Sequence, residues 1–331
     1  MGTAILMDMD PHLLRTFVTV ARCGSFSDAA RELGYTQSAV SQHIAALESD
    51  LGTPLLRRRP VTPTRAGERL LEHAGPLLLR LEAARADIAR LTSAPATRLV
   101  VGVSPLAPTH RLGAALAEVR RQQPLLEVTV RVLGRDAVVR DVATADLDLG
   151  LVDGAVAPND PLHLADAGPL TAGAVAEQPL VVALPAPHPL AGRPGLRLPD
   201  LTDARWLDAP DTAVPLARLR TAAGTDGFRA SLRYDGTDVR GLLSLVAAGH
   251  GLALLPRSAV EDTAGMVEAV GAAAVRGTHG TAGVRAVTLS APRLVHRTEV
   301  LHNGTAPAPA TLLAAALTDA PARADRAAAS Y

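Results

Sequence analysis

The sequence predicts a small all-α domain with a winged helix-turn-helix, a long linker helix and, behind them, a larger α/β domain. Helix signals follow one another closely over residues 10–66, and an apolar pattern of helical spacing continues over residues 65–92. From Leu99 onward, short apolar runs alternate with helical stretches, which is typical of α/β domains. A chain of 331 residues is also longer than one core usually supports. The expected parts are the helix-turn-helix domain at 10–67, the linker helix at 65–92, the α/β domain at 98–320 and a disordered tail at 321–331.

Composition narrows the class of protein. Apolar residues make up 48% of the chain but aromatic residues only 2%, so Leu, Val and Ala must fill the cores. The 33 basic residues are all Arg and are balanced by 33 acidic residues, so binding to nucleic acid requires a local basic patch. Cys23 is the single cysteine, which excludes an intrachain disulfide. The first residues lack the pattern of a signal peptide, and no apolar run reaches the roughly 18 residues of a membrane span, so we expect a soluble cytoplasmic protein without a membrane partner.

The first helix has clear start and stop signals. Asp10 is a favourable N-cap, and Pro11 suits the first helical position. Gly24 is a favourable residue to end the helix. The apolar face between these ends consists of Leu14, Phe17, Val18 and Ala21.

Two further helices are expected close behind the first. Ser27 is a good N-cap for a short second helix, and Gly34 suits its left-handed end. Thr36 then caps a third helix. Two helices joined by so tight a glycine-containing turn form a helix-turn-helix.

The third helix has two unlike faces. Its apolar face consists of Val40, Ile44, Leu47 and Leu51. A polar face near its N-terminus consists of Gln37, Ser38, Ser41 and Gln42, and His43 adds a phosphate or base contact. Short polar side chains at this end of a helix can read base edges in the major groove. The alternative is an ordinary solvated face.

A short, turn-rich segment at residues 52–64 follows and carries Arg57, Arg58 and Arg59. Such runs are often solvated loops, but directly behind a helix-turn-helix this one fits a wing whose arginines contact phosphates or the minor groove. The expected DNA-binding residues are therefore Thr36, Gln37, Ser38, Ser41, Gln42, His43, Arg57, Arg58 and Arg59.

Residues 10–67 resemble the DNA-binding domain of the LysR-type transcriptional regulators. The residues that carry the resemblance are Gly24–Ala30, Leu33, Gln37–Ser41, Ile44, Leu47-Glu48, Leu51-Gly52, Pro54-Leu55, Arg58 and Thr64–Gly67. The sequence departs from the family's usual residues at Ser38, Leu56 and Pro63, and its wing is short. The resemblance implies a regulator that binds a double-stranded DNA operator, assembles as a dimer or tetramer and acts with RNA polymerase.

A weaker resemblance extends to about residue 320. It rests on segments Val101–Ser104, Asp146–Val152, His188–Leu190 and Leu245–Pro256. It implies an α/β effector domain like a periplasmic binding protein, with two lobes around a cleft that binds a small molecule. The sequence does not identify this effector.

The linker helix carries a regular apolar seam. The spacing alternates between four and three residues through Leu70, Ala74, Leu77, Leu81, Ala84, Ile88 and Leu91. We expect dimerisation through Leu70, Leu77, Leu81 and Ile88, although such a helix can also pack on its own domain. Two copies would place two recognition helices on a roughly palindromic operator. Thr64 can cap this helix, and Gly75-Pro76 is expected to interrupt and kink it.

In the α/β domain, Leu99–Ser104 and Leu126–Val132 read as strands with a helix between them, which predicts a parallel pair. Ligands of such sheets bind outside the carboxyl ends of strands, beside helix N-termini. This rule predicts effector contacts at Ser104, Arg135, Asp153 and Thr237. Ser104 and Thr237 are each expected at the start of a helix, one in each lobe. Asp153 would favour a hydroxyl or a cation. Ordinary caps and turns are the alternative for each residue.

An enzyme, or a ligand-binding protein with an accessory DNA-binding module, is the rival class. The sequence has no Walker loop, no G-x-S-x-G and no H-E-x-x-H motif, and its ten histidines are scattered. We therefore expect no catalytic residue, no metal site and no cofactor. A purely structural DNA-bending protein is a third class, but it would not need so large an α/β domain behind the helix-turn-helix. Effector-dependent DNase footprinting would separate all three classes.

Overall fold

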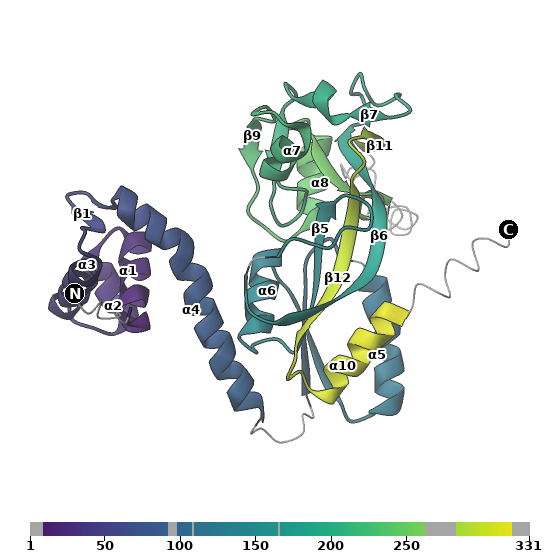
Figure 1. Cartoon of the computed structure of the whole chain (residues 1–331). Helices are drawn as coiled ribbons and strands as arrows, with labels where there is room; N and C mark the ends of the chain where they lie inside the picture. Colours follow the sequence, from purple (N-terminus) through teal and green to yellow (C-terminus); the bar gives the residue numbers. More distant parts are fainter. Residues whose placement is uncertain (1–8, 92–97, 108, 165, 262–282, 320–331) are drawn as a thin grey trace, which may run out of the picture. The chain divides into compact units, whose positions relative to one another are not determined.

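The computed structural model describes residues 9–91, 98–107, 109–164, 166–261 and 283–319 (Figure 1). The chain forms two compact units, Met1–Ala86 with Ala165–Gly168 and Asp87–Leu164 with Pro169–Tyr331. The expected tail at 321–331 and the residues that follow Leu91 up to position 97 lie outside the described residues. Among the described helices, none combines the length and the apolar composition that a membrane crossing requires.

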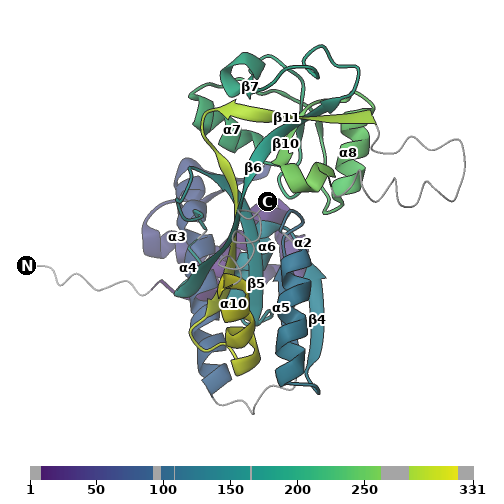
Figure 2. The same ribbon diagram turned by 90° about the vertical axis from the view of Figure 1, so that its right-hand side faces the viewer.

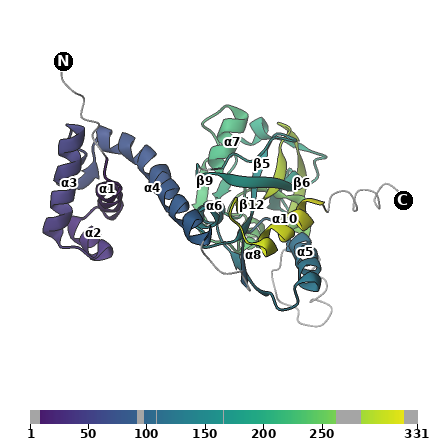
Figure 3. The same cartoon turned by 60° about the horizontal axis from the view of Figure 1, so that its bottom comes forward.

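The first unit is the predicted winged helix-turn-helix. Its helices are α1 (Pro11–Cys23), α2 (Phe26–Leu33) and α3 (Gln37–Leu51), which Figure 3 shows gathered together. Its wing is an antiparallel pair, β1 (Leu56–Arg58) and β2 (Val61–Pro63). The three helices and the wing share one apolar core, formed by Phe17, Val20, Ala29, Ala30, Val40, Ile44, Leu47, Leu55 and Leu56.

Local capping explains where these helices begin and end. Asp10 accepts a hydrogen bond from the backbone N of His12 (2.8 Å), and Thr36 accepts one from the backbone N of Ala39 (3.2 Å), as predicted. The prediction of Ser27 as the second cap is wrong. Ser25 caps α2 by accepting from the backbone N of Asp28 (3.3 Å), because its extended backbone turns the hydroxyl toward the helix end.

Helix α4 (Arg65–Leu91) is the predicted linker helix. Thr64 caps it by accepting from the backbone N of Gly67 (3.1 Å). The predicted interruption at Gly75-Pro76 is wrong, because Pro76 lies inside one continuous helix of 27 residues. A proline removes only one backbone donor. The helix continues past Pro76 because its many other backbone hydrogen bonds remain.

The apolar seam of α4 divides into two parts. Leu70 packs against the core of the first unit, and Ala74 is fully buried. This end of the seam therefore packs within its own chain and is not available to a second copy. Farther along, the side chains of Leu77 and Ile88 are 51% and 66% exposed, and Leu91 is exposed too. In α3, Leu51 is likewise exposed at 39%, unlike the prediction, because it lies in the last turn of the helix.

The second unit is an α/β domain built on one mixed sheet of eight strands. Its strands are β3 (Arg98–Val103), β4 (Glu127–Val132), β5 (Leu149–Val156), β6 (Leu170–Pro185), β7 (Leu196–Arg197), β10 (Ala253–Pro256), β11 (Val284–Ala291) and β12 (Val295–Asn303). The predicted parallel pair is β3 and β4. Helices α5 (Thr109–Gln122) and α10 (Ala308–Asp319) lie side by side (Figures 1 and 2), and α6 (Arg135–Ala143) packs against β5.

The long strand β6 divides this unit into two lobes. Its residues 170–179 pair with β12 in the first lobe, and its residues 180–185 pair with β10 and β11 in the second. The second lobe also contains the 3-10 helix η1 and four further elements: η1 (Leu198–Leu201), β8 (Trp206–Asp208), α7 (Leu216–Ala223), β9 (Ala230–Arg233) and α8 (Val239–Ala247). Each lobe has its own apolar core, so the two-lobed effector fold is confirmed.

Candidate DNA-binding surface and effector site

The polar face of α3 is available at its N-terminal end. Gln37, Ser38 and Gln42 are exposed and Ser41 is half-buried. Gln37 Nε2 donates to Ser41 Oγ (3.3 Å), and the hydroxyls of Thr36 and Ser38 are 2.9 Å apart. These contacts hold the side chains together while leaving amide and hydroxyl groups free to meet base edges.

Glu48 fixes the wing to α3, a role that the sequence reasoning missed. Its Oε1 accepts from the backbone N of Leu55 (2.8 Å) and of Leu56 (3.1 Å). Its Oε2 accepts from Arg58 (3.3 Å), whose guanidinium also lies 4.9 Å from the centre of the Phe26 ring. The signal was a carboxylate placed one helical turn before a turn-rich segment.

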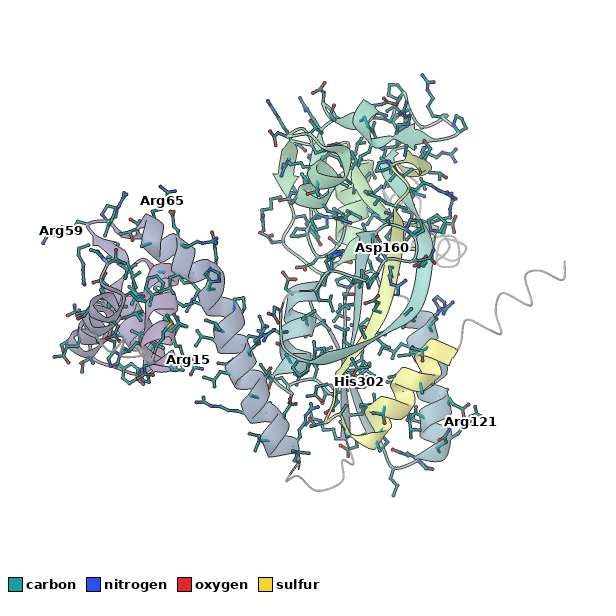
Figure 4. The ribbon with its side chains drawn as sticks, in the orientation of Figure 1. Arg15, Arg59, Arg65, Arg121, Asp160 and His302 are labelled. Atoms are coloured by element: carbon teal, nitrogen blue, oxygen red, sulfur yellow. The ribbon has the colours of Figure 1, made fainter. Side chains whose placement is uncertain are left out.

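The three wing arginines are therefore not equivalent. The guanidinium of Arg58 forms an ion pair with Glu48, whereas the guanidinium groups of Arg57 and Arg59 have no hydrogen-bond or ion-pair partner among the described residues, and both residues are exposed. Figure 4 shows Arg59, and Arg65 at the start of α4, pointing away from the domain. Arg57 and Arg59 are thus better placed than Arg58 to neutralise phosphates.

Replacing Glu48 tests this role of the carboxylate. Glu48→Ala should destabilise the first unit by about 2 kcal/mol, because two backbone donors beside buried leucines lose their acceptor. Glu48→Gln should retain most of that stability, since its amide oxygen can accept the same bonds. Thermal unfolding followed by circular dichroism checks this, and equal melting of the two variants would contradict it.

In the effector domain, three of the four predicted residues meet around one carboxylate. Ser104, at the end of β3, donates to Asp153 Oδ1. Arg135, at the start of α6, lies 3.9 Å from Asp153 Oδ2. His296 of β12, which the sequence reasoning missed, donates its Nε2–H to Asp153 Oδ2 (2.9 Å). Ser104, Asp153 and His296 are all at least 98% buried.

The environment of Asp153 decides its charge. Burial alone raises the pKa of a carboxyl, but the hydrogen bond and charge of His296, then Arg135 and Ser104, bring the pKa of Asp153 below its ordinary value. Asp153 is therefore a buried carboxylate. Two polar atoms at this cluster, Arg135 Nε and His296 Nδ1, are buried without a hydrogen-bond partner among the described residues.

A pocket of about 120 Å³ opens beside this cluster, between the lobes. Arg135 and Asp153 line it from the first lobe, Pro215 and Arg218 from the second, and residues 162–164 from the loop after β5. Arg218 is held by its Nε donating to the carbonyl of Ala155 (3.0 Å). The pocket thus has two guanidinium groups and one carboxylate at its wall.

Two details of the predicted effector contacts are wrong. Ser104 does not present its hydroxyl to a helix N-terminus, because the buried hydroxyl is bonded to Asp153 and α5 begins only at Thr109. Thr237 does not start α8. Asp238 caps that helix by accepting from the backbone N of Arg240 (3.0 Å), and Thr237 is exposed one residue before the cap.

Cys23 lies at the end of α1, where its thiol donates to Glu32 (3.6 Å). Loss of hydration raises the pKa of the Cys23 thiol, which keeps it protonated and slow to react with peroxide. Cys23→Ser is expected to leave DNA binding unchanged with and without peroxide. Operator binding that responds to peroxide in the unsubstituted protein and not in Cys23→Ser would refute this.

A helix-turn-helix with a wing, followed by a two-lobed α/β domain, defines a DNA-binding transcription regulator with an effector-binding domain. Residues 11–68 match the family model described as the bacterial regulatory helix-turn-helix protein of the LysR family, and residues 92–297 match the LysR substrate binding domain. The chain belongs to the LysR family. It is a LysR-type transcriptional regulator.

Curated relatives support this membership. The small neutral protease regulatory protein of Streptomyces coelicolor is 32% identical over 255 residues, which cover 74% of this chain and 72% of that protein. The HTH-type transcriptional regulator BudR of Raoultella terrigena is 29% identical over 255 residues, covering 76% and 85%. Homologues of the chain are thus transcriptional regulators.

Solved structures of full-length proteins are similar as well. Full-length BenM matches with a TM-score of 0.48 and 22% identity, covering 94% of this chain and 96% of that one. Full-length CbnR, solved with its target DNA, matches with a TM-score of 0.45 and 19% identity, covering 94% and 99%.

Proposed function

We propose that α3 reads the operator in the major groove through Gln37, Ser38, Ser41 and Gln42, while the wing contacts the DNA backbone. The observation that carries this proposal is the pairing of an exposed amide-rich face with a wing that Glu48 holds beside it. Thr36 and His43 complete the surface, and Arg57 and Arg59 supply its uncompensated charge. Arg58 contributes less, because it already contacts Glu48.

Self-association is the second part of the proposal. The exposed stretch of the α4 seam, from Leu77 to Ile88, pairs with the same stretch of a second copy. A dimer or tetramer then binds a two-fold symmetric operator and acts with RNA polymerase in the cytoplasm. This assembly explains why large apolar side chains remain exposed on a helix of a regulator.

Selection from a pool of random duplexes tests DNA reading and does not require the operator sequence. The full chain is expected to enrich duplexes that contain two inverted half-sites separated by whole helical turns. Enrichment of a single asymmetric half-site would refute self-association through α4. Failure to enrich any sequence would refute base reading by α3.

For the effector, we propose the pocket between the lobes. Asp153 is already compensated by Ser104 and His296, so the charged groups that remain for a ligand at the wall are the guanidinium donors of Arg135 and Arg218. This charge pattern favours a small molecule rich in acceptors, such as a carboxylate, rather than the hydroxyl or cation suggested by Asp153 alone. A pocket of about 120 Å³ limits its size.

A panel of small carboxylates tests the effector site. A member that binds should raise the melting temperature of the effector domain and change operator affinity. Arg218→Met should remove the thermal shift, whereas Arg193→Met, an exposed arginine outside the pocket, should retain it. If Arg218→Met keeps the thermal shift, the effector binds outside this pocket.

A further inference from the structure

Two histidines and a tyrosine form a cluster beside α3. His12 Nε2 lies 2.8 Å from the hydroxyl of Tyr35, and the rings of His12 and His43 are 5.0 Å apart. The rings of Tyr35 and His43 are 5.5 Å apart. Tyr35 directly precedes Thr36, the cap of α3, and His43 lies on α3 itself, so the cluster adjoins the reading face.

The hydrogen bonds define which nitrogen of His43 is free. Thr16 Oγ1 donates its single hydrogen to the carbonyl of His12 (3.0 Å), so it accepts from His43 Nδ1 at 3.3 Å. His43 therefore carries its proton on Nδ1. Its Nε2 has no hydrogen-bond partner among the described residues and becomes a donor only when the ring is protonated.

Protonation of His12 has a matching effect on Tyr35. In the tautomer with its proton on Nδ1, neutral His12 accepts the Tyr35 O–H through Nε2, whereas charged His12 donates to the Tyr35 oxygen. The Tyr35 hydroxyl is then free to donate to another acceptor. Two charged rings with centres 5.0 Å apart repel each other, and an anion that contacts both offsets this repulsion.

We propose that His12, Tyr35 and His43 form a proton-dependent clamp for a phosphate of duplex DNA beside the recognition helix. In the protonated state the clamp presents His43 Nε2–H, the Tyr35 O–H and positive charge. The inference rests on the proposed docking of α3. It adds His12 and Tyr35 to the proposed DNA-binding surface. It also makes DNA affinity depend on pH, which contacts from the reading face alone would not do.

The charged residues next to His12 on α1 already have other partners. Asp10 uses its carboxylate to cap α1 at the backbone N of His12 (2.8 Å). Arg15, one turn farther along α1, contacts Glu82 (2.6 Å). From α3 and the turn before it, His43 and Tyr35 are the titratable groups in contact with His12.

The test compares affinity for a random-sequence duplex at about pH 6 and pH 8, where imidazole changes charge but arginine and phosphodiesters do not. The unsubstituted chain should bind about tenfold more tightly at the lower pH, because binding takes up protons. The double variant His12→Gln, His43→Gln should change less than about twofold over this range. Tyr35→Phe should lose part of the gain, and His73→Gln, an exposed histidine on α4, should keep all of it.

An unchanged pH dependence in the double variant would overturn the clamp, and so would the absence of any pH dependence in the unsubstituted chain. Arg57→Ala separates this failure from failure of the docking. It should weaken binding equally at both pH values if the wing contacts DNA. Arg57→Ala that binds like the unsubstituted chain would instead reject the proposed wing contact.

Discussion

Glutamate at both Leu77 and Ile88 is expected to convert the protein to monomers and to weaken binding of a two-half-site duplex by about 100-fold or more. Both side chains are more than half exposed on α4, and a charge at either position would have to be buried in a seam between two copies. A monomer contacts only one half-site, so it loses the gain in affinity that comes from binding two half-sites at once. Sedimentation and duplex titration measure the two effects.

Arg85→Glu is the matched control for this variant. Arg85 is exposed on the same helix but outside the apolar seam, and its replacement changes the net charge by as much as the two glutamates do. The control should remain an oligomer and bind normally. Oligomers from the double variant would show that α4 does not hold the copies together, and monomers from Arg85→Glu would show that the loss comes from added negative charge rather than from the apolar seam.

The second large effect is expected at Asp153. Asp153→Asn should destabilise the effector domain by about 3 kcal/mol near neutral pH, because Arg135 loses its counter-charge and the buried hydrogen bond from His296 loses a charged acceptor. Asp160→Asn, at an exposed aspartate that Figure 4 labels, should change stability little. Chemical denaturation, followed through the unfolding transition of the effector domain, measures the change in stability of both variants.

The pH dependence of that loss has a defined sign. The pKa of Asp153 is lowered in the folded protein, so its contribution is present above the unfolded pKa of a carboxyl and is lost as pH falls through the folded value. The difference between the unsubstituted protein and Asp153→Asn should therefore shrink in acid. A constant difference from neutral pH down to strong acid would contradict a buried carboxylate.

The helix-turn-helix was predictable because its signals are local. Caps, glycine ends and apolar periodicity act over a few residues, and Asp10, Thr36 and Gly34 have the predicted roles. The error at Ser27 arose because Ser25 is an equally good cap, and only the backbone angles decide between them. Glu48 escaped prediction because its partners are the backbone N–H groups of Leu55 and Leu56, and its place one turn before the wing was its only signal in the sequence.

The effector site was predictable in part. The rule that ligands meet the carboxyl ends of parallel strands placed Ser104 and Asp153 together, with Arg135 at the next helix. His296 could not be found in this way, because β12 returns antiparallel from far along the chain to lie between β5 and β6. Thr237 was misplaced because its neighbour Asp238 is the stronger cap.

The distinction between base reading and backbone contact also requires tertiary information. Arg57, Arg58 and Arg59 are identical in sequence terms, yet only Arg58 contacts Glu48 and the ring of Phe26. The sequence predicts a basic wing but not which charges are already compensated. The structure assigns Arg58 a smaller expected effect on DNA binding than Arg57 and Arg59.

The most direct test of DNA reading by α3 is the ratio of affinities for a selected duplex and a scrambled one. Gln37→Ala, Gln42→Ala should reduce affinity for the selected duplex by about tenfold or more, since a lost base contact costs about 1–3 kcal/mol. Its affinity for the scrambled duplex should not change, whereas Arg57→Ala should weaken both and lower the salt slope by about one. A glutamine variant that keeps the full preference for the selected duplex would contradict sequence reading by this helix.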